Sequence, residues 1–376
     1  MYKIASIFIF VIYILPFTIV LDTKFFFEYF QVITILLAFI LGGYIVHKPK
    51  YKEPIDYTSF YIFNNKILFI IFIIYFLLNL NLYIDILKHL LVYKDYTHWL
   101  LENTIARYAG ELDTGPIKKI STILFMIYMI LLGAYQGGNK KIYYFLLFLL
   151  FIAETAALSR ATVLMGFVAF FIEYLIRNNC YFSMLKSKQI VKIGLYVFFL
   201  LAIIFFFSAY FRVQNETNIE EILLKKIGEY IIAHYEALFM WMQNINDYAN
   251  TYGFSTFTAL YKIFTNVEVQ SGFYDGVNTS YGHTVIFTTI RGFLADFGYI
   301  VTVFLFFIFG FLIKYFTYHR MTFISYFFIR IILFLLLYIF YSPFLFATVF
   351  VAYMLSYFIL IVQKIKIARR SRYVQN

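Results

Sequence analysis

Long apolar segments recur along almost the whole 376-residue chain, and they limit its possible folds more than any other feature. A membrane-spanning helix needs about 20 predominantly apolar residues. Apolar runs of roughly this length occupy residues 4–21, 27–46, 65–83, 119–135, 142–158, 161–176, 191–211, 299–317, 322–340 and 344–363. They predict an all-α fold, a polytopic integral membrane helix bundle with about ten transmembrane helices. The first run is interpreted as a retained helix, because no small-residue cleavage site follows it.

The composition excludes a soluble globular protein, because 63% of the residues are hydrophobic and only 14% are charged. The net charge of +11 does not indicate a nucleic-acid partner, since the lysines and arginines form short clusters between the apolar runs. A single cysteine, Cys180, excludes an intrachain disulfide and any multi-cysteine metal site. The surplus of aromatic residues is also what an AT-rich coding sequence produces, so no aromatic cluster is assigned a ligand.

The basic clusters predict the orientation in the membrane. They follow the second, fourth, sixth, eighth and tenth apolar runs, near residues 48–52, 140–141, 177–192, 314–320 and 364–372. Basic residues are enriched on the cytoplasmic side of membrane proteins, so both termini are expected in the cytoplasm. Most acidic residues between Asp22 and Asp296 then lie on the outer side, which agrees with this orientation.

Two outer segments, residues 84–118 and 212–298, are too long to be simple turns, and long loops are usually functional. The second segment separates an N-terminal bundle of seven spans, residues 1–211, from a C-terminal region of three spans with a basic cytoplasmic tail, residues 299–376. Within it, residues 219–242 have the apolar stripe of an amphipathic helix that lies along the membrane or covers the bundle.

The end of this large outer loop has two further features. Residues 252–283 are rich in Gly, Ser, Thr and Asn and are expected to be irregular. Residues 284–297 are apolar but too short to span, and Thr284, Thr288 and Arg291 share one polar face. A short re-entrant or interfacial helix is therefore expected there.

Three arginines fall at the predicted outer membrane boundary: Arg160, Arg212 and Arg291. An arginine at such a boundary needs an anionic partner, and its planar donor fork matches phosphate oxygens, so together they could bind a diphosphate. Each also has a structural alternative. Arg160 could pair with Glu154 or lipid headgroups, and Arg212 could be an ordinary helix-end residue. Arg291 could pair with Asp296, although five residues place them about 140° apart around a helix.

Two histidines and one aspartate are the candidate acid–base residues. His283 is the first candidate for a general base, because an imidazole ordinarily titrates near neutral pH, although a solvated loop histidine is the simpler interpretation. His234 lies on the apolar stripe of the outer helix, so it is expected to be packed and is only a reserve base. Asp296 could act as a base or hold an arginine. No zinc spacing, acidic cluster or Gly-rich phosphate loop occurs, so no metal or cofactor is expected.

The layout resembles the Wzy-type polymerases of bacterial surface polysaccharides. The features that carry the resemblance are the span count, the late outer loop, ALSRAT at 157–162, YFR at 210–212, and NTSYGHTVIFTTIRGFLADFGYIV at 278–301. In the last segment, Asn278, Thr279, Asp296 and Gly298 match an Asn-Thr stretch followed by a short apolar segment and a D-x-G turn. The order Arg160, Arg212, His283 is also similar to that of functional residues in O-antigen ligases.

The resemblance implies a metal-independent glycosyltransferase in the bacterial inner membrane, with its active site facing the periplasm. It would join undecaprenyl-diphosphate-linked oligosaccharide repeat units, as donor and acceptor, into O-antigen or a related polysaccharide. His283 and Asp296 would be catalytic, Arg160, Arg212 and Arg291 would bind the diphosphate, and Asn278, Thr279 and His234 would contact substrate. A chain-length regulator and a flippase of the same pathway are the implied protein partners.

Two alternatives remain open at this point. A multispan glycosyltransferase with a polyprenyl-phosphate sugar donor would use a carboxylate in the first outer loop, where Asp22 lies. A flippase or transporter for the lipid-linked oligosaccharide would carry charged residues inside its spans and show repeat symmetry. The first matches the sequence less well, because that loop is very short and Asp22 has Lys24 beside it with no second acidic motif. The second matches less well, because almost all ionisable residues lie at the boundaries of the spans.

Overall fold

The computed structural model describes the helices and short strands that follow, and the remaining residues are outside the description. The described residues are 25–47, 66–96, 98–99, 102, 116–135, 140–156, 160–179, 221, 228, 232–244, 277–284, 287–318, 323–337, 340–341 and 348–362. The chain divides into two compact units. Unit 1 comprises Met1–Ile55 and Asn215–Ala347, and unit 2 comprises Asp56–Gln214 and Thr348–Asn376.

The chain is a mainly helical protein whose long apolar helices are suited to a membrane. Three described helices are long and apolar enough to span, namely Phe26–Ile45, Pro116–Ala134 and Thr289–Phe316. A bent pair, Lys66–Leu78 and Leu80–Val92, makes a fourth if it is one span. The predicted runs at 4–21 and 191–211 lie outside the described residues, so the total of about ten and the orientation stay predictions.

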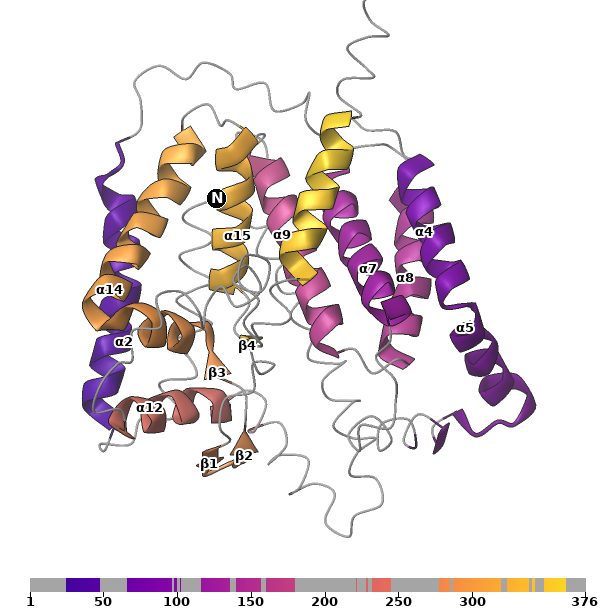
Figure 1. Cartoon of the computed structure of the whole chain (residues 1–376), viewed down its shortest axis with the longest axis horizontal. Coiled ribbons are helices and arrows are strands. Elements are labelled where there is room, and N and C mark those ends of the chain that lie inside the picture. The colour runs from indigo at the N-terminus through magenta and orange to yellow at the C-terminus, as the bar shows by residue number, and fades with distance from the viewer. Residues whose placement is uncertain are drawn as a thin grey trace, which may run out of the picture. The chain divides into compact units, whose positions relative to one another are not determined.

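Unit 1 is built on two long helices, α2 (Phe26–Ile45) and α14 (Thr289–Tyr318), which pack along each other (Figure 1). Their backbones approach closely at Gly42 and Gly310. A Cβ atom at Gly42 would collide with the carbonyl oxygen of Phe307, and one at Gly310 with that of Phe39. Small residues permit this kind of approach between apolar helices, where dispersion contacts rather than water drive association.

Helix α14 is broken at Gly298, whose φ of 68° and ψ of 177° are accessible essentially only to glycine. The chain folds back there, as shown by the distance of 5.8 Å between the ring centroids of Phe293 and Phe309. In one straight helix these residues would be about 24 Å apart along the axis. The Thr302 hydroxyl lies 3.0 Å from the Phe293 carbonyl oxygen and 2.7 Å from that of Gly298, so it bridges the break.

The sequence predicted a short helical segment over residues 284–297, but this start is too early. The helix begins at Thr289, and described residues before it form strands. Strand β1 (Val277–Thr279) pairs antiparallel with β2 (Gly282–Thr284), and β3 (Phe287–Thr288) pairs with β4 (Phe340–Tyr341). Residues 252–283 were expected to be irregular, but the described end of this segment forms a β-hairpin. In the described part of the chain, two short strand pairs therefore accompany the helices.

Helix α12 (His234–Asn244) is the described end of the predicted amphipathic helix. It contacts α2, β1 and β3, and Phe25 beside α2 lies 5.6 Å from the ring of Phe239. Residues on every side of its first two turns are buried, including Tyr235, Ala237 and Leu238. A helix lying on the membrane surface would leave its polar face in water. Helix α12 is instead packed within unit 1.

Unit 1 also contains the shorter apolar helix α15 (Phe323–Leu337), where a run over 322–340 was predicted. Arg330 in its centre is 1% exposed. A snorkelling arginine would extend its guanidinium out of the helix packing. Arg330 is instead enclosed by protein.

Unit 2 contains α4 (Lys66–Leu78), α5 (Leu80–Leu87), the π-helix η2 (Lys88–Val92), α7 (Pro116–Ala134), α8 (Lys140–Ala156) and α9 (Arg160–Asn179). The last described helix, Thr348–Val362, also belongs to it. Helix α7 begins at a proline, which is favoured at the first helical position, and packs on α9 and α4.

The axis bends by 69° between α4 and α5. Asn79 stands at this bend, and its side-chain amide donates to the Tyr75 carbonyl oxygen at 2.9 Å. That hydrogen bond competes with continuation of the helix. Helical structure nevertheless resumes and extends to Val92, so the first part of the outer segment predicted at 84–118 is helical.

Candidate functional site

Arg291 lies on the short helical segment that precedes the break in α14. It is 7% exposed, and its guanidinium carbon lies 4.9 Å from the ring centroid of Trp241 in α12. A cation over an indole face is stabilised by the ring quadrupole, more so where water is excluded. This contact with α12 thus holds the arginine inside unit 1.

Asp296 occupies the same short segment, two residues before Gly298, and is fully buried. Thr288 and Thr289, which lead into the segment, are also buried. The break therefore places one cationic, one acidic and two hydroxyl side chains within an apolar unit. Buried ionisable groups are expensive in a membrane protein and are a default sign of a functional site.

The β1–β2 hairpin carries three of the predicted site residues. Asn278 pairs with His283 across the hairpin, and Thr279 pairs with Gly282. The side chain of His283 is outside the description, so its role as a base stays a prediction. Asn278 is exposed, which leaves it accessible to a ligand.

Glu236 of α12 fixes this hairpin, a role that the sequence analysis did not anticipate. Its carboxylate accepts hydrogen bonds from the Ser280 backbone N–H at 3.0 and 3.1 Å and from the Ser280 hydroxyl at 2.5 Å. Glu236 is itself buried. Charge-assisted hydrogen bonds of this kind are about twice as strong as neutral ones, so Glu236 positions the hairpin on α12.

His234, at the start of α12, is buried, as its place on the apolar stripe predicted. Burial lowers the pKa of its imidazole to about 3, because desolvation disfavours the charged form. A histidine with this pKa is neutral at physiological pH and a poor proton acceptor. The structure therefore argues against His234 as the reserve base, and its inaccessibility also argues against contact with substrate.

The other two predicted arginines belong to unit 2 by sequence. Arg160 is the first residue of α9, and its side chain is outside the description. Arg212 lies outside the described residues altogether. The predicted convergence of these arginines with Arg291, His283 and Asp296 is therefore untested.

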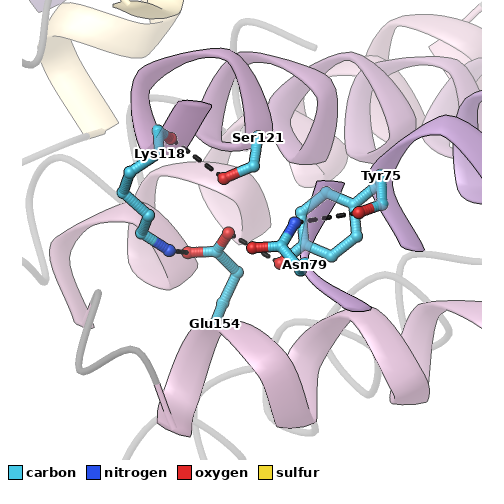
Figure 2. Close-up of polar contacts among 5 residues, drawn as sticks. All are labelled: Tyr75, Asn79, Lys118, Ser121 and Glu154. Atoms are coloured by element: carbon cyan, nitrogen blue, oxygen red, sulfur yellow. Dashed lines mark hydrogen bonds and ion pairs between the residues drawn. The ribbon is translucent and has the colours of Figure 1, made fainter. Parts of the chain in front are cut away.

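Unit 2 has a polar cluster of its own, made by Tyr75, Asn79, Lys118, Ser121 and Glu154 (Figure 2). Glu154 in the last turn of α8 has no exposed surface. One of its carboxylate oxygens accepts from the Tyr75 hydroxyl at 2.8 Å, and the other lies 3.3 Å from the Lys118 ammonium. The cluster joins the end of α4, the start of α7 and the end of α8.

From the sequence, Glu154 was expected only as a possible partner for Arg160. In the structure, both of its carboxylate oxygens have partners from α4 and α7. The available signal was that Lys118 and Glu154 fall at the same predicted boundary of neighbouring spans, whereas Tyr75 lies within the predicted run 65–83. Which of those spans pack together is a tertiary property, so the pairing could not be read from spacing along the chain.

Among the described residues, no group of three or more His, Cys, Asp or Glu side chains is arranged to hold a metal ion. Comparison with protein-family models, curated proteins and solved structures finds no match to this chain. Any functional proposal therefore depends on the residues and their geometry.

Proposed function

We propose that the chain is a polytopic inner-membrane polymerase that joins diphosphate-linked oligosaccharide repeat units at the periplasmic face. The observation that carries the proposal is the broken helix α14, which buries Asp296 and holds the buried Arg291 against Trp241. The fold-back at Gly298 has the geometry of a re-entrant segment ahead of a span. With about ten spans and cytoplasmic termini, this segment belongs to the outer side.

In the proposed reaction, a base removes the proton from an acceptor sugar hydroxyl as its oxygen bonds to the anomeric carbon of the donor. The bond from that carbon to the diphosphate oxygen breaks, and the undecaprenyl diphosphate leaves with the electron pair. Arg291 is suited to stabilise the charge that develops there, because a preorganised cation in a water-poor site acts strongly on a developing anion. His283 remains the proposed base, and Arg160 and Arg212 remain proposed diphosphate ligands.

The decisive experiment complements a strain that lacks the gene and examines the size distribution of its surface polysaccharide. Arg291→Ala is expected to abolish the long chains and leave single repeat units on the surface. Arg291→Lys keeps the charge but loses the bidentate fork, so we expect it to restore only a small part of the polymer. Lys314→Ala is the matched control, because Lys314 lies on the same helix against Tyr44, 6.0 Å from its ring centroid.

The outcomes separate the alternatives. Normal chains in the deletion strain would refute the proposal. Complete absence of surface sugar would indicate a flippase. Glu173 in α9 and Arg330 in α15 are charged residues buried within apolar helices, which is a feature expected of a flippase. Loss of polymer with Asp22→Ala but not with Arg291→Ala would indicate a transferase that uses a polyprenyl-phosphate donor.

A further inference from the structure

The segment after the bent helix pair folds into a compact group of side chains, the His89 cluster, made by His89, Tyr93, Asp95, Tyr96 and Trp99. His89 lies in the π-helix η2, and such helices occur frequently at functional sites. Lys94 reverses the chain with a φ of 57°, a conformation that non-glycine residues seldom adopt. This turn brings Asp95 and Trp99 back against His89.

The imidazole of His89 is held on two sides. Its Nδ1 lies 2.7 Å from the Asp95 carboxylate. The Trp99 ring stacks on it, with centroids 4.9 Å apart and an interplanar angle of 18°, and Tyr93 lies 5.2 Å away. Backbone hydrogen bonds from Asp95 to His89 and from Trp99 to Asp95 close the turn.

This arrangement fixes the hydrogen-bonding character of the ring. Asp95 accepts from Nδ1–H, which leaves Nε2 of the neutral imidazole as an acceptor. In the described part of the chain no hydrogen bond to Nε2 is seen, and the side chain is 22% exposed. The Asp95 side chain is 42% exposed and has a second acceptor oxygen. The cluster thus offers two acceptors beside aromatic faces.

A saccharide matches these features. Its hydroxyl groups donate hydrogen bonds, while the C–H groups on one side of the ring form an apolar face that packs on an aromatic ring. An aromatic belt at the membrane surface would account for Trp99 and the tyrosines, but it requires no imidazole oriented by a carboxylate. The pairing of His89 with Asp95 therefore indicates a polar ligand.

The neighbouring residues indicate that this ligand would bind at the membrane–water interface. Leu90, Leu91 and Val92 precede the turn, and Leu91 is 70% exposed. Exposed apolar residues next to Trp and Tyr are typical of a segment at the membrane–water interface. By the predicted orientation, that interface is the outer one.

We propose that the His89 cluster is a saccharide-binding site that holds a sugar of the lipid-linked oligosaccharide at the membrane surface. His89 and Asp95 accept sugar hydroxyl hydrogen bonds, and Trp99 supplies the packing face. The assignment to a lipid-linked sugar rests on the proposed polymerase function, whereas saccharide binding itself does not.

The test measures tryptophan fluorescence of the full-length protein in detergent micelles. The chain has two tryptophans, so Trp241→Phe leaves Trp99 as the only emitter. Methyl glycosides of hexoses, N-acetylhexosamines and 6-deoxyhexoses are the probes, and mannitol is the control for nonspecific effects. We expect a saturable change in emission with at least one glycoside and none with mannitol. No saturable change with any glycoside would overturn the proposal.

Variants locate the binding site. His89→Ala and Asp95→Ala should weaken binding about tenfold or more. His98→Ala is the matched control, because His98 pairs with Glu102 at 3.3 Å on the same segment and both side chains are largely exposed. Asp95→Asn can keep the hydrogen bond from Nδ1–H through its amide oxygen, but it replaces the second acceptor oxygen of Asp95 by an NH2 donor. We expect this variant to weaken binding while its thermal stability is unchanged; undiminished binding would contradict the proposal.

A complementation assay with Trp241 intact separates this inference from the proposed function. We expect His89→Ala to shorten the polysaccharide and His98→Ala to leave it unchanged. If Arg291→Ala abolishes polymer while His89→Ala does not alter it, the His89 site is wrong and the polymerase proposal stands. If the deletion strain makes normal chains but glycosides still bind, the polymerase proposal fails and the saccharide site stands.

Discussion

The carboxylate of Glu154 illustrates how a single residue can join three helices. It has no exposed surface, and its two oxygens meet Tyr75 of α4 and Lys118 of α7. Lys118 is partly exposed, with 25% of its side chain accessible, so its ammonium is less costly to hold there than the carboxylate. The pair therefore fixes helix ends more than it adds net stability.

This unequal burial predicts a specific pattern in a double-mutant cycle. Lys118→Met leaves the Glu154 carboxylate buried without its cation, and we expect it to lower the free energy of unfolding by about 1–3 kcal/mol. Adding Glu154→Gln removes the buried charge, so the double variant should be more stable than Lys118→Met alone. Thermal unfolding in detergent measures both, and equal losses would contradict a buried ion pair.

The buried imidazole of His234 predicts a dependence of stability on pH. Its pKa is about 3 in the folded chain and near 6.5 when exposed, so the unfolded state binds the proton more readily. The stabilising contribution is complete above pH 6.5 and is lost as the pH falls toward 3. Between pH 7.5 and 5 we expect a loss of about 2 kcal/mol. Thermal melts of the wild type and of His234→Leu should differ in this dependence, and parallel curves would refute it.

At the scale of elements, the break in α14 determines where the short segment lies. Gly298 supplies the backbone conformation, and the buried Thr302 hydroxyl bridges the carbonyl oxygens on the two sides of the break. The segment is thereby held against its own span, with Phe293 packed on Phe306 and Phe309. The position of Arg291 depends on these contacts.

Substitutions at the break should act on structure and activity together. Gly298→Ala forces an alanine into a glycine-only conformation, at a cost of about 1–3 kcal/mol. Thr302→Val keeps the shape of the side chain but removes the hydroxyl, which should lower the free energy of unfolding by about 1 kcal/mol. Thr302→Ser retains the hydroxyl. We expect shortened polysaccharide with Gly298→Ala and Thr302→Val at matched membrane expression, and wild-type chains with Thr302→Ser. Normal chains in all three would show that the break does not position the site.

The sequence predicted these elements unevenly, for physical reasons. The run at 27–46 matches α2 to within one residue, because an apolar stretch in lipid must satisfy its backbone as a helix. The D-x-G turn at 296–298 likewise predicted the position of the break in α14. The β1–β2 hairpin and the Glu154 cluster were missed, since Glu236 and Lys118 act across elements far apart in the chain.

At the scale of the whole molecule, the predicted threading can be tested with the only cysteine. Cys180 lies in a basic loop predicted to be cytoplasmic, so a membrane-impermeant maleimide should label it in inside-out vesicles but not in right-side-out ones. A Cys180→Ser chain that carries His98→Cys should give the opposite result. Labelling of Cys180 from outside would reverse the orientation and remove the basis for an outer-face site.

The fold-back at Gly298 also has a consequence for how this region can change. Arg291 precedes Gly298 by seven positions, just under two helical turns, so both lie on nearly the same side of the short segment. Loss or gain of one residue between them would rotate the guanidinium by about 100° about the helix axis and away from Trp241. This interval therefore cannot change in length without moving Arg291 away from Trp241, so the count of residues is itself part of the site.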